Sequence, residues 1–361
     1  MTSKKLTFTD LLKQKTWTDY SQFVSEAPAF YNEEVAKHVI EEKKLIEELK
    51  RTPEFKSLKI RKAYDKFDEA NNLLFTGKVV AVDGTRSQYR LYSGIRCQVG
   101  VVAVNYTGEK IQHSFYISEA NLKDSPDDVL SRIAGRVTFD DNLSDMAIRG
   151  LMLYREREAG LSDKFKDCKV MFHGPLLPFE LMSGLGRLEA LNATLEILRQ
   201  IVKEKRFFSV ISSTAYQDYL TFGRAINPGE YFTAEKFTLG HHLANSSSFL
   251  SYKDKWRPNE RVEVEEFIRN YCEQILIGVI RVGERPYVFH AHREIFDLAA
   301  AIIYRDSLLQ REKGFPLLLD YADSLCTQYF KSSDYKSLIE YELAKRGAYL
   351  SEAPERELRR K

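Results

Sequence analysis

Cysteine pairs, long apolar runs and net charge are all scarce in this sequence. The four cysteines lie far apart and none belongs to a C-x-x-C pair, which excludes a disulfide scaffold, a zinc ribbon and a dithiol redox motif. The apolar runs have the length of β-strands and fall far short of the ~20 residues of a membrane span. The chain contains 54 Lys and Arg residues and 52 Asp and Glu residues, for a net charge of +2. Any basic surface that binds nucleic acid must therefore be confined to a local patch.

The composition is that of an ordinary globular protein. The chain has 361 residues, of which 43% are hydrophobic and 29% charged, and this length allows two or three small domains or one elaborated domain. No internal repeat or low-complexity segment occurs, and the first residues contain no uninterrupted apolar stretch of the kind that signal peptides carry. We therefore expect a soluble, cytoplasmic protein that does not enter a membrane.

Residues 1–74 are rich in charge and carry apolar residues at helical spacing. Residues 32–51 place Val35, Val39 and Leu45 roughly on one stripe among Glu and Lys side chains, which predicts an amphipathic helix. A second amphipathic helix is predicted for residues 56–74. We expect this region to be an N-terminal helical extension that packs on the rest of the chain or on a partner; a DNA-binding helix is the alternative, although the charges of the segment alternate in sign.

Residues 75–347 alternate between strand and helix patterns and predict one domain. Three β-rich apolar runs favour an antiparallel meander. The predicted strands are residues 77–82, 95–105, 110–117, 169–172 and 207–212, followed by a hairpin over 274–281 and 286–291. One predicted helix begins at Ser125, and the others cover residues 144–159, 184–204, 214–225, 295–309 and 316–330. Residues 227–258 are predicted to be mostly loop with short strands. This is the order of an RNase H-like domain, so we expect an α/β fold with a mixed sheet flanked by helices. Residues 348–361 form a charged tail.

Asp83 closes the first buried strand of this region and is followed by Gly84. Glycine lets the backbone turn sharply and lets a ligand approach closely. A carboxylate at the end of a central strand is well placed to hold Mg²⁺ or Mn²⁺, which accept oxygen ligands. An Asp-Gly pair is also typical of a hairpin turn, and both interpretations remain open at this point.

His173 and Glu156 are the next candidates. His173 ends the predicted strand 169–172 and would share a crevice with Asp83 if the two strands are neighbours; otherwise it is a hydrogen-bonded structural residue. Glu156 continues the apolar stripe of Ile148 and Met152 at a spacing of four, and a carboxylate on a core-facing stripe needs a partner or a metal. Glu158 is an alternative on the same helix. Either glutamate could instead be a solvated surface residue without a role in a site.

Four segments together resemble the NurA nucleases. They are VVAVDGTRS, the strand IRCQVGVVAV, the segment VMFHGPLLP, and the closing run LIGVIRVGERPYVFHAHREIF followed by GFPLLLDYADSLCTQYF. In order and spacing the similarity covers roughly residues 75–347. The resemblance implies an RNase H-like fold, Mn²⁺- or Mg²⁺-dependent processing of DNA ends, a ring-like homodimer, and docking on a hexameric HerA-type DNA-translocating ATPase.

The resemblance also implies site residues, and three of them depart from the family pattern. Asp83 matches the first catalytic aspartate, and Glu156 is the best match to the helical glutamate, with Glu158 not excluded. The second strand-end aspartate of the family is His173 in this chain. The closing motif, Tyr-Pro followed by Ala-His, is present here as Phe315-Pro316 and Ala322-Asp323.

The exchange at His173 and Asp323 keeps one carboxylate and one imidazole in the set. We therefore predict a permuted catalytic and metal site of Asp83, Glu156, His173 and Asp323. The imidazole nitrogen favours Mn²⁺ over Mg²⁺, since Mg²⁺ prefers oxygen ligands. The phenol that the family carries at position 315 is absent, and the opposing interpretation is a NurA-fold dimer without activity that clamps DNA or regulates the motor.

Basic and aromatic residues directly follow Asp83. Arg86, Tyr89, Arg90 and Tyr92 are predicted to follow a phosphate backbone and stack on bases, in a mode suited to single strands or DNA ends without base readout. An exposed polar hairpin edge is the structural alternative. The functional prediction is a nuclease that acts on DNA ends with a HerA-like ATPase, in end resection, repair or defence.

Overall fold

A computed structural model describes residues 8–13, 20–91, 94–118, 145–186, 188–212, 216–233, 237–246, 249–250 and 256–348. Contacts divide the chain into two compact units, residues 1–56 and 57–361, which are described separately. The predicted helix start at Ser125 and nearly all of the charged tail lie outside the described residues.

The first unit consists of α1 (Phe8–Lys13), α2 (Tyr20–Lys50) and α3 (Pro53–Lys56). The helix predicted for residues 32–51 is confirmed as the C-terminal part of α2. Thr52 separates α2 from α3, because its hydroxyl donates to the Leu49 carbonyl and accepts from the Phe55 amide. Several apolar side chains of α2, Val35 and Leu45 among them, are exposed, and their packing on a partner stays a prediction.

The second helix predicted for residues 56–74 is wrong over its first half. Residues Lys59–Lys62 form strand β1, which pairs antiparallel with β7 (Glu230–Thr233). All four side chains of β1 are exposed, so the strand carries no apolar alternation that reveals it in the sequence. Only α4 (Phe67–Phe75), which follows the 3₁₀ turn Ala63–Lys66, is helical as predicted. These elements pack with the sheet, and the second unit accordingly begins at Ser57.

The second unit is built on one nine-stranded mixed sheet with the strand order β1-β7-β8-β9-β6-β5-β2-β3-β4. The remaining strands are β2 (Val79–Leu91), β3 (Gly94–Val104), β4 (Lys110–Ser118), β5 (Lys169–His173), β6 (Phe207–Ile211), β8 (Ile275–Arg281) and β9 (Pro286–His292). Strands β2, β3 and β4 form the predicted antiparallel meander, β5 lies parallel to β2, and β6 lies parallel to β5. The predicted α/β class, with a mixed sheet flanked by helices, is confirmed, and its assignment as RNase H-like stays a prediction.

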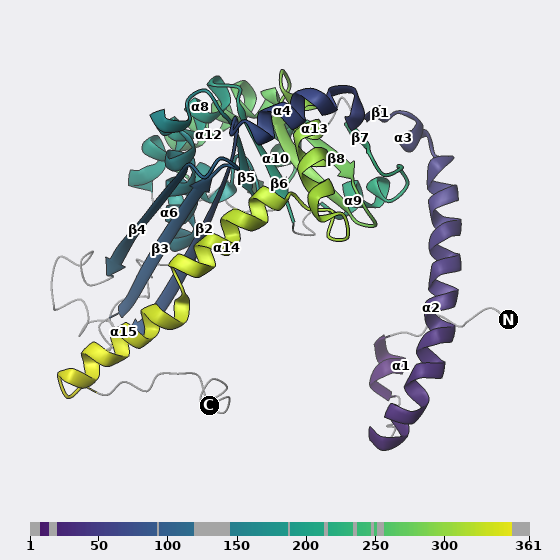
Figure 1. The fold of residues 1–361 in the computed structure, drawn as a ribbon, viewed down its shortest axis with the longest axis horizontal. Coiled ribbons are helices and arrows are strands. Elements are labelled where there is room, and N and C mark those ends of the chain that lie inside the picture. The colour runs from purple at the N-terminus through teal and green to yellow at the C-terminus, as the bar shows by residue number, and fades with distance from the viewer. Residues whose placement is uncertain are drawn as a thin grey trace. The chain divides into compact units, whose positions relative to one another are not determined.

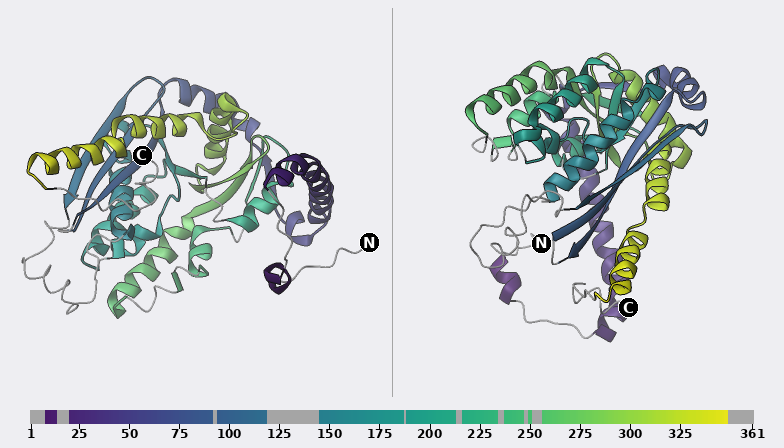
Figure 2. Two further views of the ribbon diagram at one scale, coloured as in Figure 1. Left: turned by 90° about the horizontal axis from the view of Figure 1, so that it is seen from below. Right: turned by 90° about the vertical axis from the view of Figure 1, so that its left-hand side faces the viewer.

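Helices cover both faces of this sheet. One face is covered by α6 (Asp145–Gly160), α8 (Leu191–Lys203) and α12 (Pro258–Asn270), and the other by α4, α13 (Phe296–Ser307) and α14 (Leu317–Tyr329) (Figures 1 and 2). Shorter helices are α7 (Phe179–Met182), α9 (Gln217–Gly223) and α10 (Leu239–Ala244), the last lying in a region predicted to be mostly loop. Helix α15 (Ser332–Lys345), which the sequence analysis did not predict, follows α14 past β2. Among the described residues no helix combines the length and apolar composition needed to cross a membrane.

Asp306, at the end of α13, ties three parts of the core together. This fully buried carboxylate accepts hydrogen bonds from the Tyr106 hydroxyl at 2.5 Å and from the Leu318 amide at 2.9 Å. The second bond caps the first turn of α14, the helix that carries Asp323. Burial raises the pKa of Asp306 to about 6, although the two donors and Arg305 oppose the shift.

This raised pKa predicts a pH dependence of stability. A carboxyl group whose pKa is higher in the folded state than in the unfolded state adds stability below the unfolded pKa, and this stability is lost as the pH rises through the folded pKa. We expect the Asp306 contribution to fall by roughly 2–3 kcal/mol between about pH 4 and pH 7. The unfolding free energy of the wild type, measured in urea relative to that of Asp306→Asn, should therefore fall by this amount over this range; a difference between the two proteins that is independent of pH contradicts the assignment.

Candidate active site

The candidate site lies where β2 continues past the end of its neighbour β5. The parallel pairing of β2 with β5 covers only Val79 to Val82 on β2, because β5 ends at His173. On its other side β2 stays paired with β3 as far as Leu91. Asp83 is thus the first residue of β2 beyond the ladder with β5. Crevices of this kind, at the carboxyl ends of strands, are where α/β sheets bind ligands.

Asp83 and His173 meet in this crevice. The Nδ1 atom of His173 lies 3.6 Å from Oδ1 of Asp83, and the two side chains are 31% and 10% exposed. The other ring nitrogen, Nε2, is 2.8 Å from the hydroxyl oxygen of Ser212. Burial lowers the pKa of His173, but the Asp83 carboxylate outweighs this effect and, with Glu156 and Asp323, raises the pKa above its ordinary value. The imidazole is therefore held by an acidic neighbour on one side and a hydroxyl on the other.

Gly84 lets α6 approach β2 and brings Glu156 to the same place. A Cβ atom at position 84 would lie 2.6 Å from Oε1 of Glu156 and 2.8 Å from Cγ of Met152, so any larger residue would push the helix away. Gly84 is paired with Val101 within the β2–β3 ladder. The hairpin-turn interpretation of Asp83-Gly84 is therefore wrong, and the glycine serves the close packing of a helix.

Glu156 is buried beside an arginine. The Nη1 atom of Arg157 donates to Oε2 of Glu156 at 2.6 Å, and both side chains are almost completely shielded from solvent. The other guanidinium nitrogen, Nη2, donates to the backbone carbonyls of Pro175 and Leu176, just after β5. Burial raises the pKa of Glu156 to about 8 against the opposing charge of Arg157, and the charge of Asp83 adds to the rise. Arg157 thus joins α6 to the chain that follows His173.

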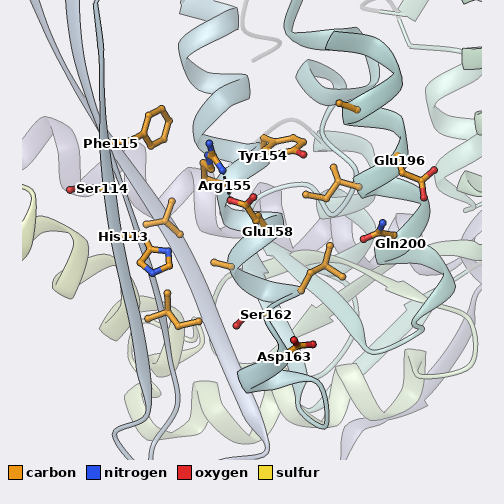
Figure 3. Close-up of a pocket in the computed structure, with 16 residues that line it drawn as sticks. His113, Ser114, Phe115, Tyr154, Arg155, Glu158, Ser162, Asp163, Glu196 and Gln200 are labelled. Atoms are coloured by element: carbon orange, nitrogen blue, oxygen red, sulfur yellow. Dashed lines mark hydrogen bonds and ion pairs between the residues drawn. The ribbon is translucent and has the colours of Figure 1, made fainter.

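Glu158, the alternative to Glu156, lies outside this cluster. Its carboxylate pairs with Arg155 at 2.6 Å, and its side chain is 53% exposed. Glu158 and Arg155 line a separate cavity of about 880 Å³ together with His113 of β4, and these side chains are labelled in Figure 3. Glu156 is therefore the glutamate of α6 that faces Asp83.

Asp323 reaches the cluster from α14. Burial raises its pKa, and the charge of Asp83 together with a hydrogen bond between the two carboxyl groups raises it further. Cys326, one turn later on α14, holds the helix against β2, because its thiol donates to the Asp83 carbonyl at 3.2 Å. The two carboxyl groups are close enough that ionisation of one opposes ionisation of the other.

The four predicted site residues therefore come together at Asp83, from β2, α6, β5 and α14. Three carboxylates and one imidazole suit a divalent cation, Mn²⁺ in particular, in their chemistry. Within the described ranges, no three His, Cys, Asp or Glu side chains lie close enough to share one ion. Their approach to Asp83 is a finding, and their binding of a metal stays a prediction.

Phe315 covers the cluster on the side of His173. Its buried ring lies 5.5 Å from the imidazole of His173 and 5.2 Å from the ring of Tyr287, centroid to centroid. The hydroxyl of Tyr287 donates to the Lys313 carbonyl at 2.9 Å, so it does not replace the phenol that the family has at position 315. The wall beside His173 is aromatic and carries no hydroxyl at this position.

Structural comparison finds NurA nucleases. The NurA nuclease from Sulfolobus solfataricus matches with a TM-score of 0.49 at 12% identity, over 93% of this chain and 98% of that one. A NurA bound to dAMP and manganese matches with a TM-score of 0.42 at 12% identity, over 85% and 96%. An endonuclease V from Bacillus subtilis matches with a TM-score of 0.33 at 11% identity, over 77% and 95%. No protein-family model matches the chain, and no curated protein matches it.

The predicted DNA-contact residues after Asp83 are engaged within the protein where the structure describes them. Arg86 forms an ion pair with Asp145 at the start of α6, at 2.6 Å. Tyr89 lies against Glu340 of α15, and burial followed by the Glu340 charge raises the pKa of its phenol. The side chain of Arg90 and all of Tyr92 lie outside the described residues. Contact of this segment with DNA stays a prediction.

Two residues of the site carried no signal in the sequence. Arg157 lies in a run of alternating charges, RERE, in which Arg155 and Glu158 pair at the surface while Arg157 and Glu156 pair in the interior. Ser212 follows β6 and touches His173 only because β6 is the neighbour of β5. Strand order is a tertiary property, and a single sequence does not reveal it.

Proposed function

We propose that this protein is a divalent-metal-dependent nuclease that hydrolyses phosphodiester bonds at DNA ends. The observation that carries the proposal is the convergence of Asp83, Glu156, His173 and Asp323 at the open edge of β2. Bringing carboxyl groups together, two of them with raised pKa values, costs stability, and perturbed groups of this kind cluster at functional sites.

Each of these residues has a distinct part in the proposed chemistry. No three of these side chains lie close enough to share one ion as they stand, so Asp83, Glu156, His173 and Asp323 would have to draw together around the cation, which would supply Lewis-acid stabilisation of the phosphate and activation of water. The Asp83 carboxylate holds Nδ1 of His173 and the Ser212 hydroxyl holds Nε2, so the ring is oriented at both nitrogens. Asp323 is the most exposed of the four and has a raised pKa, which suits it to hold or release a proton at the solvent side.

The resemblance to NurA nucleases extends this proposal to partners and cellular role. We propose action with a hexameric HerA-like ATPase, as a homodimer in the cytoplasm, in DNA end resection, repair or defence. These parts of the proposal depend on the sequence motifs of residues 75–347.

A second candidate function is a catalytically inactive NurA-fold dimer that clamps DNA or regulates the motor. The observation that favours it is the set of departures around Asp83: His173 replaces a carboxylate, Phe315 carries no hydroxyl, and Glu156 already has a cationic partner in Arg157.

Cleavage assays on end-labelled single- and double-stranded DNA distinguish the two candidates. The nuclease proposal predicts cleavage in Mn²⁺, less in Mg²⁺ and none in excess EDTA. It also predicts that His173→Asp lowers cleavage by roughly 10–100-fold, the usual cost of disturbing a metal environment. Cleavage that appears only in His173→Asp supports the inactive candidate, and cleavage that resists the chelator contradicts the metal-dependent scheme.

A further inference from the structure

A second group of polar side chains lies next to the site, on the side of β6 and β9. Ser212 follows β6, Arg285 lies in the turn between β8 and β9, and Lys313 lies in the segment between α13 and α14. All three are exposed. We call them the basic edge of the site.

Ser212 connects this edge to the candidate cluster. Its hydroxyl oxygen lies 2.8 Å from Nε2 of His173, and its backbone carbonyl accepts from Nη2 of Arg285 at 2.9 Å. The guanidinium of Arg285 and the imidazole of His173 therefore contact the same residue, which places Arg285 one residue away from the candidate cluster.

A row of aromatic rings fixes the position of the basic edge. The guanidinium carbon of Arg285 lies 5.4 Å from the ring centroid of Tyr287, and the ammonium of Lys313 lies 5.7 Å from that of Phe315. Tyr287 and Phe315 contact each other, and Phe315 contacts His173. Because both rings are buried, they form a rigid floor beneath the two cations and are not free to stack on a DNA base.

The two cations differ in how far their charge is neutralised. Lys313 pairs with Asp320 at 2.5 Å, and Asp320 also accepts from Gln310. In the part of the chain that the structure describes, no carboxylate lies within 4 Å of the Arg285 guanidinium, which donates to the neutral backbone carbonyl of Ser212. The charge of Arg285 is therefore not neutralised by a neighbouring carboxylate and can attract an anionic ligand. This attraction opposes the repulsion of a polyanion by the carboxylates of the candidate site.

We propose that Arg285, assisted by Lys313, binds a backbone phosphate of the DNA strand next to the bond that is cut. The planar guanidinium presents paired donors that match phosphate oxygens. No base-stacking ring or base-reading side chain accompanies it among the described residues of this edge, so the contact is independent of sequence. This inference rests on the proposed nuclease function and adds the residue that positions its substrate.

DNA binding in EDTA tests the proposal without any cleavage. Fluorescence anisotropy of a labelled single-stranded oligonucleotide should show that Arg285→Gln weakens binding roughly tenfold at low salt. Over about 50–200 mM salt, the slope of log K against log salt should become shallower by about 0.7, the value of one lost phosphate contact on a single strand. Lys313→Gln should have a smaller effect, since Asp320 already neutralises part of its charge.

Two further variants make this result specific. Arg285→Lys should keep the salt slope, because it keeps the charge, but bind less tightly than wild type. Arg199→Gln, which removes a half-buried arginine from α8, away from the basic edge, should bind as wild type does. The proposal is overturned if Arg285→Gln binds with wild-type affinity and slope, if Arg199→Gln loses as much, or if the wild type binds no DNA at low salt. If DNA binding depends on Arg285 but the protein cleaves no DNA in Mn²⁺, the phosphate-binding role of Arg285 is supported. Only the proposed nuclease activity is then refuted.

Discussion

Asp83→Asn is expected to remove DNA cleavage, with a loss of about 10³-fold or more in kcat/KM, which corresponds to the several kcal/mol that a metal-held transition state supplies. Asparagine has nearly the same shape, and the Cys326 thiol bonds the backbone carbonyl of residue 83, which the substitution leaves in place. The change also removes one of several neighbouring negative charges, so the variant should fold as stably as the wild type. Urea unfolding beside the cleavage assay separates lost chemistry from lost structure.

The two glutamates of α6 provide a matched comparison for this prediction. Glu156→Gln removes the carboxylate that faces Asp83, whereas Glu158→Gln removes an exposed carboxylate two residues away that pairs with Arg155. Cleavage should fall by a similar factor in the first variant and stay at the wild-type level in the second. Full activity in Asp83→Asn, or equal losses in the two glutamine variants, refutes the assignment of the site.

The sequence indicated the positions of Asp83 and His173 because each is the first polar residue after a buried apolar run, VVAV in one case and VMF in the other. The prediction that Asp83 closes its strand is wrong, because β2 continues to Leu91. Asp83 nevertheless stands where the parallel pairing of β2 with β5 stops, beside the end of β5 at His173. Glu156 was indicated by its place on an apolar helical stripe, and it is buried as that spacing predicts.

The remaining features depend on contacts between distant parts of the chain. Strand β1 carries only exposed side chains, so its pairing with β7 leaves no periodic trace. Arg86 was expected to contact DNA, but it forms an ion pair with Asp145, which lies 59 residues later in the chain. On α6, the alternating charges of the run RERE form a solvent-exposed pair, Arg155–Glu158, and a buried pair, Arg157–Glu156. Only the packing of α6 on the sheet determines which pair is buried.

The exchange of His173 and Asp323 that the resemblance to NurA nucleases implies is compatible with the geometry of the cluster. Both side chains contact Asp83, His173 from the end of β5 and Asp323 from α14. Two positions that face one carboxylate can exchange an imidazole and a carboxylate without changing the total charge around it. Phe315 has no such compensating partner, because the nearby phenol of Tyr287 is bound to a backbone carbonyl.

Arg157→Met is expected to cause the largest loss of stability, about 3–5 kcal/mol in unfolding free energy. The substitution keeps an unbranched side chain of similar length but leaves Glu156 buried without its partner and the carbonyls of Pro175 and Leu176 without a donor. The shift should be visible as a lower urea midpoint with an unchanged slope.

Arg155→Met is the natural control, since Arg155 and Glu158 form an ion pair of the same 2.6 Å length on the same helix but in solvent. Exposed pairs contribute about 1 kcal/mol or less, so this variant should stay close to the wild type. Glu156→Leu combined with Arg157→Met should recover most of the stability lost in Arg157→Met alone, because no unpaired charge then remains in the interior. Equal losses in Arg157→Met and Arg155→Met contradict the prediction. If the double variant recovers stability but not cleavage, the fold does not require the buried Glu156–Arg157 pair. The pair then serves the function of the candidate site.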